Sequence, residues 1–151
     1  MTATGMVDKI SDALAASGLG VAGIKLASDP PPANPQSANL PLLYVLSGPA
    51  SHNDGEQIVE VTRTFRVQVA VIPTGLGDPN TREKTCRPLL DAVTEKYRSY
   101  YRLASVDFVE RIRLVRDSGI VVLPEYGYKY IGFELQIEVV YFAPRSFTSG
   151  E

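Results

Sequence analysis

The stretch YKYIGFELQIEVVYF, residues 128–142, is the longest unambiguous strand pattern in the chain and decides its fold class. Successive side chains of a strand point to opposite faces, so alternating polarity indicates one buried face and one exposed face. Every odd position from 131 to 141 is apolar, whereas the even positions carry Glu134, Gln136 and Glu138. The pattern therefore predicts a strand with a core face and a polar face.

A second stretch, TFRVQVAVI (64–72), alternates in the same way, with apolar side chains at its odd positions. If these strands share a sheet with the stretch ERIRLVR (110–116), its polar face carries a mixed grid of opposite charges. Such a face suits water, a substrate or another copy of the protein, and the pattern leaves these alternatives open. The residues of this grid are Arg66, Gln68, Arg111, Arg113, Glu134, Gln136 and Glu138.

Two segments have the apolar spacing of amphipathic helices. In residues 4–17, Met6, Ile10 and Leu14 recur at every fourth position, and a helical period returns over residues 81–103. Pro88 lies inside the second pattern, so either the helix kinks there, or it begins near Thr85 and holds Pro88 in its first turn.

The remaining segments predict strands and turns. A short strand over 20–28 precedes a loop with five prolines, and strands at 42–48 and 58–72 form a hairpin around the turn-rich segment 49–57. A second hairpin joins residues 109–119 to 128–142. The order α-β-ββ-α-ββ predicts a single α+β domain over residues 1–151, in which two helices pack on one face of a mainly antiparallel sheet built from two β-hairpins. Residues 144–151 are predicted to be a polar C-terminal tail.

The composition is that of an ordinary globular protein. Of the 151 residues, 44% are hydrophobic and 21% are charged, and the net charge is −2, which disfavours a protein that neutralises many phosphates. We expect no secretory leader and no membrane segment. One cysteine excludes an intramolecular disulfide and fits a soluble protein in a reducing compartment.

The candidate catalytic motifs are weak. GLGVAG (18–23) matches a dinucleotide fingerprint, but a helix precedes it and a strand follows, which is the reverse of the required order. His52 lies in a turn, and Cys86 lies on the apolar stripe of the second helix. Asp91 and Glu95 fit a solvated, salt-linked helix face. We therefore predict no catalytic residues, no metal site and no cofactor, and we expect that the protein is not an enzyme.

The tyrosines suit either the rim of the core or a protein interface, because each combines an apolar ring with a polar tip. They cluster at the end of the second helix and along the last hairpin, at Tyr97, Tyr100, Tyr101, Tyr126, Tyr128 and Tyr130.

Four stretches and their order carry a resemblance to a known family. After the N-terminal helix and a loop come LPLLYVLSG (40–48), an acidic turn, TRTFRVQVAVIP (62–73), the helix CRPLLDAVTEKY (86–97) and the closing YIGFELQIEVVYF (130–142). This layout, over about residues 4–143, resembles the tail terminator (tail completion) proteins of long-tailed bacteriophages. The resemblance rests on the order, length and pattern of the elements rather than on a signature motif.

The resemblance implies a structural virion protein at the head-proximal end of the tail, assembled in the host cytoplasm. Such a protein forms a ring with copies of itself, typically a hexamer, that caps the tail tube, ends its polymerisation and joins the tail to the head-side connector or neck. Its partners would be the tail tube protein and that connector, with no membrane, and DNA would pass through the lumen without sequence-specific binding. The loops 28–41 and 47–57 would reach toward the tube or the connector.

On this interpretation the charged strand faces meet neighbouring subunits or the channel. We expect Arg66, Arg111 and Arg113 to face Glu134 and Glu138 across the subunit interface. Reversing both glutamates is then expected to block ring formation and leave the monomer folded.

Two other interpretations remain open. One is another head–tail joining ring protein, such as a neck or head-completion protein. The more distant one is a dimeric small-molecule-binding α+β domain with a pocket between sheet and helix.

Overall fold

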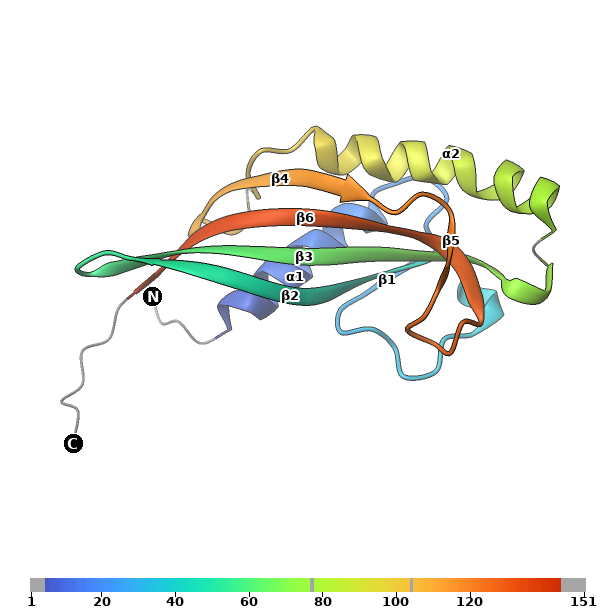
Figure 1. Cartoon of the computed structure of the whole chain (residues 1–151), viewed down its shortest axis with the longest axis horizontal. Coiled ribbons are helices and arrows are strands. Elements are labelled where there is room, and N and C mark those ends of the chain that lie inside the picture. Colours follow the sequence, from blue (N-terminus) through green and yellow to red (C-terminus); the bar gives the residue numbers. More distant parts are fainter. Residues whose placement is uncertain (1–4, 77, 104, 145–151) are drawn as a thin grey trace.

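A computed structural model of the chain describes residues 5–76, 78–103 and 105–144. Six strands form one sheet in the order β1-β2-β3-β6-β4, with β5 also paired to β6 (Figure 1). The elements are α1 (Met6–Leu19), β1 (Leu26–Ser28), β2 (Leu42–Asp54), β3 (Ile58–Pro73), α2 (Pro79–Arg98), β4 (Val109–Asp117), β5 (Val121–Leu123) and β6 (Tyr130–Pro144).

The predicted α+β class and element order are confirmed. All strand pairs are antiparallel except β1 and β2, which run parallel over three residues. β6 joins three strands of the sheet, since it pairs with β3 from Pro144 to Tyr130 and with β4 and β5 along its other edge.

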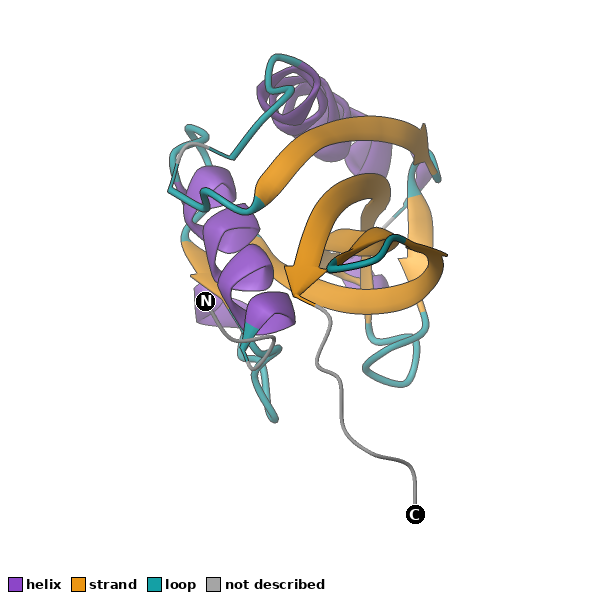
Figure 2. Ribbon diagram, turned by 90° about the vertical axis from the view of Figure 1, so that its left-hand side faces the viewer, coloured by secondary structure: helices purple, strands orange, loops and turns teal. Residues whose placement is uncertain are grey.

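The alternation that predicted a core face on β6 is also confirmed. Its odd positions from Ile131 to Tyr141 are all buried, and so are Phe65 and Val67 on β3. Both helices pack on this face (Figure 2). The hydroxyl group of Tyr97 in α2 donates a hydrogen bond to the main-chain oxygen of Leu14 in α1, which joins the two helices inside the core.

Of the two alternatives predicted for Pro88, the one in which the helix begins near Thr85 is wrong. The Asp78 carboxylate accepts hydrogen bonds from the backbone N–H of Thr81 at 3.0 Å and from its hydroxyl group at 2.9 Å. This N-cap, followed by Pro79 at the first helical position, begins the helix at Pro79 rather than near Thr85. Pro88 therefore lies in the helix interior, and the helix ends at Arg98.

The first hairpin is longer than predicted, because β2 continues through most of the segment 49–57. Ser51 to Asp54 read locally as turn residues, yet each pairs with a residue of β3. Polar side chains are tolerated here because this part of β2 is exposed. The predicted strand over 20–28 shortens instead to Leu26–Ser28, and of the predicted tail 144–151 Pro144 ends β6 while the rest lies outside the described residues.

Candidate subunit interface

The polar face of the sheet is divided into a covered half and an open half. The covered half carries a second, smaller apolar cluster on the side opposite the helices. The Pro-rich segment 29–41 and the β5–β6 turn contribute to this cluster, whose buried members are Leu40, Leu42, Tyr44, Ala70, Leu123 and Tyr130.

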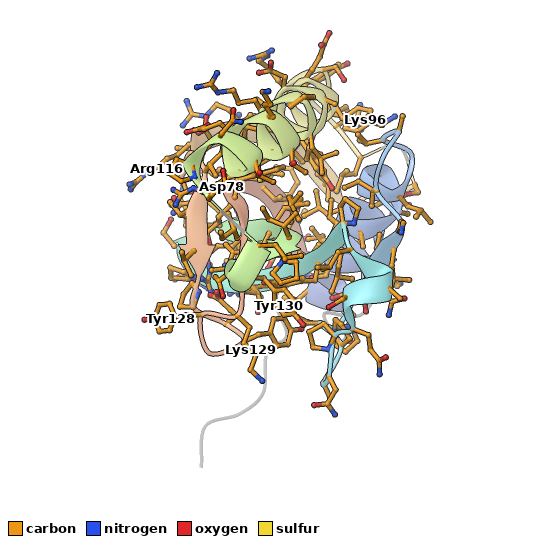
Figure 3. All side chains as sticks on the ribbon, turned by 90° about the vertical axis from the view of Figure 1, so that its right-hand side faces the viewer. Asp78, Lys96, Arg116, Tyr128, Lys129 and Tyr130 are labelled. Carbon is orange, nitrogen blue, oxygen red and sulfur yellow. The ribbon has the colours of Figure 1, made fainter. Side chains whose placement is uncertain are left out.

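Tyrosine hydroxyl groups hold the Pro-rich loop against this half. Tyr126 donates to the carbonyl oxygen of Pro32 at 2.6 Å, and Tyr130 donates to that of Pro35 at 3.0 Å. The rings of Tyr126 and Tyr44 meet edge to face, with centroids 5.5 Å apart. The loop predicted to reach outward therefore folds back on its own sheet. Tyr128, in contrast, is 64% exposed (Figure 3).

A polar network marks the border between the two halves. Tyr44 donates to the Gln68 side-chain oxygen at 2.6 Å, and the Gln68 amide donates to Glu134 at 2.9 Å. Arg66 completes the network by bonding Glu134 at 3.2 Å and Glu125 at 3.1 Å. Burial, with a further contribution from Glu125, raises the pKa of Tyr44, so its hydroxyl group stays protonated and able to donate.

Because of this network, two of the predicted interface residues stabilise the fold of the monomer itself. Gln68 is only 1% exposed, so it stabilises the chain's own sheet and is not presented at the surface. Glu134 has bonds to Arg66 and Gln68, and reversing its charge would therefore disturb the monomer as well as an interface. The double reversal of Glu134 and Glu138 would therefore not test the subunit interface alone.

The open half presents the other predicted residues. Arg113 pairs with Glu138 at 3.5 Å on adjacent strands, and Gln136 lies 3.5 Å from Glu134 through its amide nitrogen. Arg111 is exposed, with no ion pair or hydrogen bond from its side chain among the described residues. Arg116, a residue that the prediction did not include, projects from the same edge of the sheet (Figure 3). Contact of this half with a neighbouring subunit stays a prediction.

The motifs that the sequence offered as weak catalytic candidates lie in different segments of the structure. GLGVAG covers the end of α1 and the turn before β1, so no helix N-terminus follows it. His52 is exposed on β2, and burial raises the pKa of the Cys86 thiol. Asp91 and Glu95 are exposed, and the ion pair of α2 joins Arg87 and Glu83 instead.

A pair of carboxyl groups that the sequence analysis missed lies between α1 and the loop after β1. Asp29 and Asp12 line a cavity of about 290 Å³ with alanine neighbours. Burial, followed by a hydrogen bond and charge repulsion from Asp12 and repulsion from Asp8, raises the pKa of Asp29 to about 7. Asp12 and Asp29 are remote in sequence, and no spacing rule connects them.

Replacing Asp29 with Asn should change how stability depends on pH. A carboxyl group with a raised folded pKa binds its proton more tightly when folded, so its ionisation destabilises the fold as pH rises from about 4 to about 7. Because the site is partly exposed, solvent screens part of the effect, and we expect a loss of about 1–2 kcal/mol over this range. Thermal unfolding from pH 4 to 8 should show this decline in the wild type and a flatter curve in Asp29→Asn.

The control for this prediction is Asp91→Asn, an exposed position on α2. It should keep the wild-type pH dependence. An Asp29→Asn protein that declines as steeply as the wild type would contradict the assignment.

Within the described segments, no group of three or more His, Cys, Asp or Glu side chains could hold a metal ion. Neither described helix has the length and apolar character needed to cross a membrane. No model of a known protein family matches the chain, and no curated protein matches it.

Proposed function

We propose that this protein is a tail terminator of the kind found in long-tailed bacteriophages. It would assemble into a ring, typically hexameric, that caps the tail tube, stops its growth and offers the other ring face to the head-side connector. DNA would pass through the ring without sequence readout. The proposal includes no catalytic step and no cofactor.

The observation that carries the proposal is the open half of the sheet, where several charged groups remain available to another molecule. Arg111 and Arg116 project from this half, and the Arg113 side chain remains 69% exposed although it pairs with Glu138. On the covered half, in contrast, the Pro-rich segment and the β5–β6 turn bury the apolar cluster of Leu42, Tyr44 and Tyr130. A subunit with one such face suits contact with further copies, because complementary charge selects and orients partners.

The arrangement of elements gives further support. The resemblance depends on a helix, a long hairpin, a second helix and a closing hairpin, and these follow in that order. The first hairpin projects beyond the helices at one end of the molecule (Figure 1), which supplies a second surface for contact.

The test is the native mass of the purified protein over a wide concentration range, with the same samples viewed by negative-stain electron microscopy. We expect closed six-fold rings with a central hole. A discrete dimer with no ring at any concentration would contradict the proposal and favour a pocket-bearing domain. Pull-down with the tail tube and portal proteins of the same genome then separates a terminator, which binds the tube, from a neck protein, which binds the portal.

A further inference from the structure

The β2–β3 hairpin ends in a tip with an exposed apolar hollow. Ile58 is 53% exposed and Phe142 of β6 is 37% exposed, and both line a hollow of about 340 Å³. Glu60 lies on its rim and Glu56 lies in the adjacent turn. From His52 to Thr62 the chain contains no lysine or arginine, so this tip, defined as residues 53–60 with Phe142, joins exposed apolar area to negative charge.

The outer edge of β4 has a basic excess, with Arg111, Arg113 and Arg116 against the acidic Glu110 and Asp117. Val115 is 51% exposed and lies between Leu114 and Arg116, while Tyr101, from the segment before β4, is 72% exposed. Arg111 and Arg116 have no ion pair in the part of the chain that the structure describes. The acidic Asp117 is engaged locally, since its carboxylate accepts the backbone N–H of Gly119 at 2.9 Å. We call this surface, with Tyr101, Arg111, Val115 and Arg116, the β4 edge.

The Arg116 end of the β4 edge cannot reach the tip of its own chain. β3 pairs with β6 as far as Ile58 opposite Pro144, so the tip is fixed at that end of the sheet. Arg116 lies opposite Gln136, eight positions from Pro144 along β6. At about 3.3 Å per residue this separation is roughly 26 Å, which exceeds the reach of Arg and Glu side chains. Arg116 is therefore available only to another molecule. Arg111, opposite Val140, lies nearer the tip, yet it forms no ion pair among the described residues.

Side chains rather than a continued β-ladder would make the contact. The register of β4 shifts between Val109 and Arg111 and again between Leu114 and Arg116. The N–H of Ile112 also already donates to the carbonyl oxygen of Tyr101 at 2.7 Å. Bulges and occupied backbone groups of this kind disfavour strand addition at an edge.

We propose that the hairpin tip of one copy docks on the β4 edge of the next copy. The tip combines exposed apolar area with acidic residues, and the β4 edge combines exposed apolar area with arginines. Since every chain carries both of these complementary surfaces, the partner that docks is a second copy of the chain. The contact is heterologous, so repeating it gives a closed ring or an open chain. The inference rests on the proposed function, for which it identifies the contact between subunits.

The test uses two charge-reversed variants and their mixture. The tip variant carries Glu56→Lys with Glu60→Lys, and the edge variant carries Arg111→Glu with Arg116→Glu; neither breaks an ion pair among the described residues. Each variant alone should associate at least about tenfold more weakly than the wild type, because like charges now oppose each other. The mixture should assemble again, since the lysine tip fits the glutamate edge and the unchanged surfaces fit each other.

The matched control is Asp91→Lys with Glu95→Lys, two exposed acidic residues on α2. It should assemble as the wild type does, and circular dichroism should show that all variants fold. Native mass spectrometry at low salt measures the association, which added salt should weaken.

The outcomes separate the inference from the proposed function. Rings that survive both reversals, or a mixture that fails to assemble, would overturn the tip-to-edge contact while the ring itself stands. Open wild-type chains that either reversal abolishes would support the contact and contradict the closed ring. A wild-type protein that stays monomeric at its highest attainable concentration would also overturn the contact.

Discussion

Replacing Gly132 with Ala should destabilise the protein more than any other single methyl group added to the sheet. Gly132 lies in β6 opposite Ala70 of β3 and Val121 of β5. A Cβ atom at this position would overlap the carbonyl oxygen of Val69 and crowd the carbonyl carbon behind it. These are backbone atoms of the neighbouring strand, so no rotation of a side chain can relieve the overlap. We expect a loss of about 3–5 kcal/mol in the free energy of unfolding.

The close approach at Gly132 has a visible cause. The register between β3 and β6 shifts between Ala70 and Ile72, so β3 carries an irregularity directly beside this glycine. Bulges bring one backbone unusually near the next, and glycine is the residue that allows it. A larger side chain would have to move one strand away from the other or change their register.

Urea denaturation of Gly132→Ala and of Gly75→Ala provides the measurement and its control. Gly75 is exposed, and a Cβ atom there would meet nothing within 4 Å. The control should stay within about 0.5 kcal/mol of the wild type. A Gly132→Ala protein as stable as the control would show that the strands do not approach so closely.

Replacing Gln68 with Leu should cost about 2–4 kcal/mol, although leucine has a similar size and is more hydrophobic. Gln68 is 1% exposed and bridges Tyr44 to Glu134 with bonds of 2.6 and 2.9 Å. The substitution leaves the buried Tyr44 hydroxyl group without its acceptor and removes a donor from the Glu134 carboxylate. An unsatisfied buried polar group loses its hydration without a replacement, which is why the loss exceeds that of an ordinary hydrogen bond.

The double variant Tyr44→Phe with Gln68→Leu distinguishes this explanation from simple misfit. Removing both partners leaves no orphaned hydroxyl group, so the double variant should be more stable than the sum of the two single losses predicts, by about 1–2 kcal/mol. Urea denaturation of the wild type, both single variants and the double variant measures this coupling. Strictly additive losses would show that the Tyr44–Gln68 bond contributes nothing specific.

The core of the fold could be predicted because its signals are local and repeated. The alternation from Ile131 to Tyr141 identified the buried face of β6 correctly. The helical period over residues 81–103 identified most of the buried stripe of α2, which consists of Cys86, Leu89, Val93 and Tyr97. Tyr101, which the same period included, lies beyond the end of the helix and is 72% exposed. In both elements one face packs against the rest of the protein, so burial leaves a periodic trace in the sequence.

The parts that were missed depend on contacts between distant segments. Ser51 to Asp54 look like a turn until β3 supplies their backbone partners. Gln68 occupies an outward position, and only the covering of the sheet by the Pro-rich loop and the β5–β6 turn makes it internal. Gly132 did interrupt an otherwise regular strand, and a glycine inside a strand is a usable signal for a bulge or a close backbone approach.

The Pro-rich loop held by Tyr126 and Tyr130 makes the two ends of the molecule different. It seals one end of the polar face, whereas the hairpin extends the other end away from the helices (Figure 1). A subunit built this way has two chemically different ends and cannot associate equally well through both. A ring that repeats one heterologous contact inherits that polarity, so its two faces differ without a second kind of subunit.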